Sequence, residues 1–112
     1  MAIKLINANI EAGESLSEVI DCGEGKVIKI QMPKDWTFAP LTFQASNNGI
    51  LFSDVMHPNG LEVTCTVFED TAIIGLTMIS GFVKFRSGTR DQPVPQEKQR
   101  TFAVTVDTVL AG

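Results

Sequence analysis

The chain has 112 residues, of which 44% are hydrophobic, and a formal net charge of −4. This length suits a single domain spanning residues 1–112, and the hydrophobic content excludes a disordered chain. Because an acidic chain repels phosphate backbones, we expect no nucleic-acid binding. No apolar run approaches the roughly 20 residues needed to cross a bilayer. The first residues lack the features of a secretory signal, so we expect a protein that is made in the cytoplasm and contacts no membrane.

Alternating apolar residues predict short strands in the first third of the chain. Strands are expected at residues 3–8 and 27–32. In the second of these, Ile28 and Ile30 are expected to face the core. Residues 16–21 are interpreted as a further strand in preference to a short capped helix.

The clearest pattern in the chain is a strand, a turn and a second strand. Leu41 and Phe43 share one face of the first strand, because side chains alternate with period 2. Residues 47–49 (Asn-Asn-Gly) tolerate the positive φ that a tight turn needs. The apolar run at residues 50–52 then predicts the start of the returning strand.

The second half of the chain continues in the same manner. Strands are expected at residues 61–68, 72–76, 82–87 and 100–110, and residues 88–99 are expected to form a polar loop. Val63, Cys65 and Val104 are expected in the core together with Phe43, whereas Arg86 falls on an outer face. About eight antiparallel strands without a strong helix predict an all-β, single-domain β-sandwich with jelly-roll-like connections.

Few residues in the sequence indicate a catalytic or metal-binding site. His57 precedes a proline in a predicted turn, where a solvated residue is favoured over a catalytic base. Cys22 and Cys65 lack CxxC spacing and are interpreted as buried free thiols in preference to a disulfide. One histidine cannot complete a zinc site, and the acidic residues near turns match no calcium motif. We therefore expect no catalytic residue, no cofactor and no metal site, and no enzymatic activity.

Some side chains remain candidates for contact with a ligand or partner. Trp36 lies in a connection bracketed by prolines, where a plug formed with Phe38 is favoured over a sugar-stacking site. Arg86 and Arg100 either anchor the loop at residues 88–99 or are solvated. The candidate contact residues are Trp36, Phe38, Asn48, His57, Arg86 and Arg90.

Two segments carry a resemblance to a known family. Residues 32–49 (MPKDWTFAPLTFQASNNG) fit the pattern MPxxWTxAxLTFQxSxDG, and residues 84–100 (KFRSGTRDQPVPQEKQR) fit KxRSGTxxxPVxQxxxR. The chain resembles a family of short proteins encoded among the structural genes of tailed bacteriophages and prophages. Asn48 departs from the usual Asp, and Pro40 stands where the family mostly shows a small residue.

This resemblance implies a non-enzymatic structural protein of the virion, either a capsid decoration (cement) protein or a tail-associated component. Its implied partners are the major capsid or tail proteins and further copies of itself, for example in a trimer. The run LTF-x-x-S-x-x-G also resembles a strand motif of discoidin-like, galactose-binding-type sandwiches, which implies a jelly roll. The alternative function is therefore a glycan-binding module for host attachment that uses loop aromatics.

Overall fold

A computed structural model describes residues 3–74 and 79–108 of the chain. These residues form strands joined by loops and turns, and they include no helix that could cross a membrane. The strands are β1 (Ile3–Ile10), β2 (Ile20–Asp21), β3 (Lys26–Gln31), β4 (Leu41–Ser46), β5 (Ser53–Asp54), β6 (Ala72–Ile74), β7 (Phe82–Ser87) and β8 (Arg100–Asp107).

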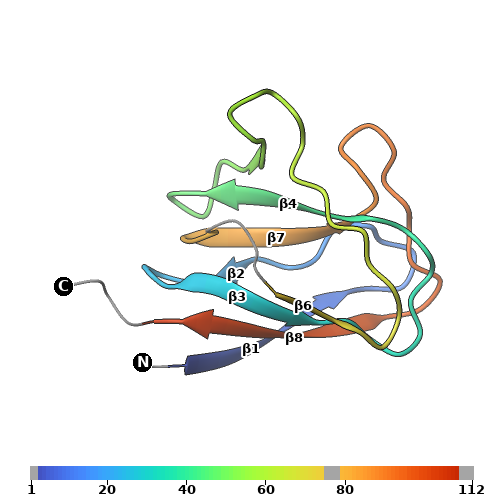
Figure 1. The fold of residues 1–112 in the computed structure, drawn as a ribbon. Coiled ribbons are helices and arrows are strands. Elements are labelled where there is room, and N and C mark those ends of the chain that lie inside the picture. Colours follow the sequence, from blue (N-terminus) through green and yellow to red (C-terminus); the bar gives the residue numbers. More distant parts are fainter. Residues whose placement is uncertain (1–2, 75–78, 109–112) are drawn as a thin grey trace.

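The strands form two antiparallel sheets that face each other (Figure 1). One sheet has the order β1-β8-β3-β6 and the other has the order β2-β7-β4-β5. Every connection except the β4–β5 hairpin therefore passes from one sheet to the other. These orders are those of an eight-stranded jelly roll, in which two sheets are joined by Greek-key connections. The expected all-β sandwich with jelly-roll connections is confirmed.

Aromatic rings connect the two sheets through the core. The rings of Phe43 on β4 and Phe85 on β7 pack edge to face with centroids 5.6 Å apart. Phe85 packs in the same way on Phe102 of the opposite sheet at 5.7 Å, and Trp36 packs on Phe102 at 5.4 Å. Edge-to-face packing is a favoured geometry for aromatic pairs, which adds to the stabilisation from burying their large apolar area.

Three of the four residues expected in the core are buried. Phe43, Val63 and Val104 have 0%, 6% and 0% of their surface exposed. Cys65 is only half-buried. The expected strand at residues 61–68 is wrong, because this stretch crosses from one sheet to the other. It pairs with β4 only at a single bridge between Leu41 and Cys65.

Three further expectations need correction. Residues 50–52 do not start a strand, and the returning strand β5 begins at Ser53. The strand expected at residues 16–21 is reduced to β2, with an isolated bridge at Leu16. In β3, the register shifts between Val27 and Lys29, and this irregularity leaves Val27 buried and Ile28 only half-buried. The expected strand residues 75, 76, 109 and 110 lie outside the described residues.

Candidate functional site

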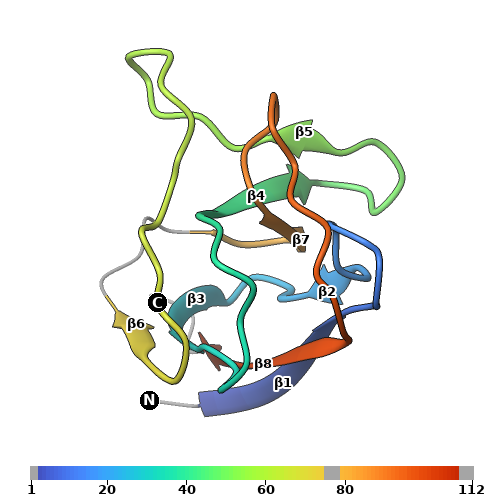
Figure 2. The same ribbon diagram turned by 90° about the vertical axis from the view of Figure 1, so that its right-hand side faces the viewer.

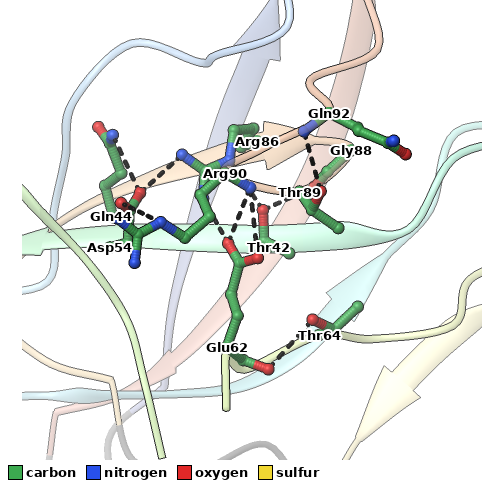
Figure 3. A network of polar contacts seen from close by, with 10 residues as sticks. All are labelled: Thr42, Gln44, Asp54, Glu62, Thr64, Arg86, Gly88, Thr89, Arg90 and Gln92. Carbon is green, nitrogen blue, oxygen red and sulfur yellow. Dashed lines mark hydrogen bonds and ion pairs between the residues drawn. The ribbon is translucent and has the colours of Figure 1, made fainter. Parts of the chain in front are cut away.

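A buried arginine lies on the outer face of the β2-β7-β4-β5 sheet. Arg86 of β7 is on that face, as the alternation predicts, but only 6% of its surface is exposed. Its guanidinium donates from Nη1 to Oδ1 of Asp54 at 2.7 Å and from Nη2 to Oε2 of Glu62 at 2.6 Å. Its Nε donates to the Thr42 hydroxyl at 2.9 Å (Figure 3). Arg86 is therefore neither solvated nor free to bind a ligand.

The strand register brings these groups together. Thr42 on β4 lies directly opposite Arg86 on β7, and Gln44 on β4 lies opposite Asp54 on β5. Glu62 is brought over the sheet by the loop that follows β5, through a bridge with Met56. Two carboxylates from consecutive segments thus neutralise one buried cation, as a buried charge requires.

Arg90 connects this cluster to the loop at residues 88–99. Its Nε lies 3.4 Å from Oδ2 of Asp54, and its backbone N–H donates to the carboxylate of Glu62. About half of its side chain remains exposed. We call Thr42, Asp54, Glu62, Arg86 and Arg90 the arginine cluster. Hydrogen bonding from Arg86 lowers the pKa of the Asp54 carboxyl, and this effect outweighs the opposing effect of burial.

The hairpin loop between β4 and β5 is held by its own side chains. The Asn48 side-chain oxygen accepts from the N–H groups of Ile50 at 2.8 Å and Leu51 at 3.0 Å. The Ser46 hydroxyl accepts from the N–H groups of Asn48 and Gly49. Asn48, a candidate contact residue, thus shapes the turn. The two apolar side chains that follow it are exposed, Ile50 at 80% and Leu51 at 76%.

A second loop, formed by residues 55–62, follows β5 in the chain and rises above the sheet (Figure 2). It turns at His57, whose carbonyl accepts from the N–H of Gly60 at 2.9 Å. His57 is exposed, as expected for a turn residue. Leu61, at the start of the strand wrongly expected at residues 61–68, is 65% exposed, and its N–H donates to the Asn59 side chain at 3.0 Å.

The connection bracketed by prolines turns one aromatic inward and the next outward. Trp36 is 7% exposed and donates from Nε1 to the carbonyl of Ala39 at 3.1 Å, which confirms that it plugs the sandwich. Phe38 was expected to form this plug together with Trp36, and that expectation is wrong. Phe38 is 73% exposed and packs on Phe68 with ring centroids 6.4 Å apart. Between them, Thr37 bonds to the Gln96 side chain through both its N–H and its carbonyl, which fixes this backbone.

Arg100 anchors the loop at residues 88–99. It is 7% exposed, and its Nε donates to the side-chain oxygen of Gln96 at 3.1 Å. Its Nη2 donates to the Thr37 hydroxyl at 3.2 Å. A hollow of about 370 Å³ opens beside these residues, lined by Asp35, Trp36, Thr37, Phe38, Glu69, Glu97 and Arg100.

Both cysteines are free thiols, and the pKa of each is raised. Burial raises the pKa of the Cys22 thiol to about 11, and the neighbouring Asp21 carboxylate adds to this effect. Burial also raises the pKa of the half-buried Cys65. Because the thiolate is the nucleophile, neither side chain is activated for catalysis. Within residues 3–74 and 79–108, no three His, Cys, Asp or Glu side chains gather in a way that could hold a metal ion.

The residues most exposed for contact were not among the candidates from the sequence. Ile50 and Leu51 were assigned to a strand, although the Ser-x-Asn-Gly turn before them could have shown that their N–H groups are used within the turn. Comparison of the chain with protein-family models, with curated proteins and with solved structures finds no match.

We predict that Arg86→Met destabilises the fold much more than Arg90→Met. The first change leaves two largely buried carboxylates without their cation, which costs about 3 kcal/mol of unfolding free energy. The half-exposed Arg90 contributes less than about 1 kcal/mol. Urea unfolding followed by Trp36 fluorescence measures both. Equal losses would show that Arg86 does not hold the loops in place.

The lowered pKa of Asp54 predicts a specific acid sensitivity. An unfolded chain binds a proton at Asp54 near the ordinary value of about 3.9, whereas the folded chain binds it only at lower pH. The stabilisation is therefore complete only above about pH 5 and is lost as pH falls through the folded pKa. We expect Asp54→Asn and Arg86→Met to flatten the fall in stability between about pH 5 and 3. Unchanged slopes in urea titrations at each pH would contradict this assignment.

Proposed function

We propose that this chain is a non-enzymatic structural component of a tailed-bacteriophage virion, either a capsid decoration protein or a tail-associated protein, that acts by protein–protein contact. The observation that carries the proposal is the hairpin tip formed by Ile50 and Leu51. Two large apolar side chains are more than three-quarters exposed there, on a loop that Ser46 and Asn48 hold in one shape.

An exposed apolar tip on a fixed loop suits a docking contact. Apolar surface that a protein exposes in a cluster marks an interaction site more often than isolated residues do. Because the turn hydrogen bonds already order the loop, a partner does not have to order it on binding. The second loop adds Leu61, and it is held over the same sheet by the bond between Glu62 and Arg86.

The resemblance to phage structural proteins supports the same function. The two segments that carry it, residues 32–49 and 84–100, include strand β4 and residues 84–87 of its partner β7. They also supply the turn at Asn48 and Arg86 of the arginine cluster, whereas Arg90 stands at a variable position of the second pattern. The departure from Asp to Asn at position 48 keeps the side-chain oxygen that accepts from the turn N–H groups. The shared residues are thus those that build the scaffold beneath the exposed tips.

The test is association with assembled particles in a density gradient. We expect the protein to co-sediment with particles of the phage that encodes it. A copy number in the hundreds would identify a capsid decoration protein, and about a dozen or fewer would place it at a vertex or the tail. We expect the double variant Ile50→Ser/Leu51→Ser to fold and to lose at least tenfold of this association.

A matched control separates docking from general loss of surface hydrophobicity. Ile74 on β6 is 74% exposed on the other sheet, so Ile74→Ser should leave the association unchanged. Absence of the wild-type protein from the particles would overturn the virion function. Full association of the double variant would show that the hairpin tip is not the docking contact.

A second candidate is glycan binding at Phe38. Its exposed ring lies beside the hollow lined by Asp35, Glu69 and Glu97, whose carboxylates could accept hydrogen bonds from sugar hydroxyls. Trp36 contributes little to such a site, because its ring is buried against Phe102.

If this second function holds, Phe38→Ala abolishes retention on a glycan array and leaves the unfolding free energy nearly unchanged. Phe68→Ala, which removes only the supporting ring, should weaken retention less. Absence of any retained glycan for the wild-type protein would exclude this function and leave the virion proposal standing.

A further inference from the structure

Strand β1 is the long free edge of the sandwich. It has eight residues and lies at the end of its sheet, where β8 is its only neighbour among the described strands (Figure 1). The other edge strands are short: β2 and β5 have two residues each and β6 has three. An exposed edge offers a row of N–H and C=O groups to another strand, and proteins usually shorten or block such edges.

Among the described residues, contacts block the edge at one end only. At Asn9 the backbone N–H donates to Oε1 of Glu18 at 2.6 Å, and the N–H of Glu18 approaches the Asn9 carbonyl at 3.4 Å. Asn9 therefore turns its backbone groups away from β8. By alternation, Asn7, Leu5 and Ile3 turn theirs the same way. No described residue bonds to the outward N–H and C=O groups of Leu5 or Asn7.

The open part of the edge is apolar and borders a groove. Leu5 is 74% exposed and Ile3 is 47% exposed, and both lie on the outer face of the sheet. A groove of about 510 Å³ runs between β1 and the facing segment of the other sheet. Its lining residues are Lys4, Leu5, Ile6, Asn7, Asn9, Glu18, Val19, Ile20 and Asp21. Val19 in this groove is a further exposed apolar residue, at 41%.

We propose that β1 pairs antiparallel with β1 of a second copy of this chain, across a two-fold axis at Leu5. Residues that turn their backbone groups outward must pair with residues that do the same. With Leu5 opposite Leu5, Ile3 of one copy lies opposite Asn7 of the other. Every residue with outward backbone groups, namely Ile3, Leu5 and Asn7, is then paired with another such residue. The pairing forms about six backbone hydrogen bonds and ends where Glu18 blocks Asn9.

The charges of the groove fit this occupant. In the proposed register, Lys4 of the second copy lies beside Ile6, facing the segment at residues 18–21. That segment has a carboxylate at each end, on Glu18 and Asp21. The two-fold axis repeats the contact, so each groove holds two ammonium groups, its own Lys4 and that of the other copy, against the two carboxylates. On the outer face the two Leu5 side chains cover each other.

A two-fold contact closes at two copies. It therefore yields a dimer, and the trimer implied by the family resemblance would need a different surface. The pairing does not depend on the hairpin tip, because Ile50 and Leu51 adjoin β5 at an edge of the other sheet. If the pairing fails, docking through that tip is unaffected.

Disulfide trapping tests the axis. Paired residues of hydrogen-bonded antiparallel strands have Cα atoms about 5.5 Å apart, within the range that a disulfide spans. We expect Leu5→Cys to form covalent dimers under mild oxidation. Ala103→Cys is the matched control, since Ala103 is exposed on the same sheet but one strand inward from the edge. The native thiols are buried or half-buried, with raised pKa values, and should contribute little.

Amide hydrogen exchange of the wild-type protein tests the backbone pairing. The N–H groups of Lys4 and Ile6 face β8 and should be protected at every concentration. Those of Leu5 and Asn7 should gain at least tenfold protection as the concentration rises and the dimer forms. The proposal is overturned if Leu5→Cys cross-links no more than Ala103→Cys. It is equally overturned if the Leu5 and Asn7 amides exchange without protection at all concentrations.

Discussion

The ion pairs of one buried arginine determine how the outer face of the β2-β7-β4-β5 sheet is built. Arg86 follows the strand alternation and would be solvated on a bare sheet. Asp54 and Glu62 cover it instead, and a buried cation keeps its carboxylates close because separating them leaves a charge without compensation. The short strand β5 and the loop after it are thus held over the sheet by electrostatics, where a two-residue ladder alone would be weak.

That arrangement has a consequence for the surface. Residues 47–52 and 55–62 flank β5, and both present apolar side chains to solvent. Both loops are already ordered before any partner binds. Turn hydrogen bonds hold residues 47–52, and the arginine cluster holds residues 55–62. The proposed self-pairing edge, β1, lies in the opposite sheet. A chain with two separate contact surfaces can join its own copies through one and a larger assembly through the other.

The sequence predicted the fold class because periodicity reports which face of a strand is buried. The positions of Phe43, Phe102 and Val104 follow from alternation alone, and the turn at Asn48 follows from side-chain chemistry. Alternation was misleading at residues 61–68, where Val63 and Val67 are buried but lie in no strand. A segment that crosses the end of a sandwich can alternate its contacts without having a neighbour to form a ladder with.

The candidate site was harder to predict for a related reason. Periodicity assigns Arg86 to an outer face but does not reveal that a distant loop covers that face. Periodicity likewise assigns Ile50 to the start of an apolar strand, although the N–H of Ile50 donates a hydrogen bond to the side-chain oxygen of Asn48. In both places, side-chain hydrogen bonds override the pattern of apolar residues. Exposed apolar residues that follow a self-capped turn are therefore better interpreted as a presented surface than as a missing strand.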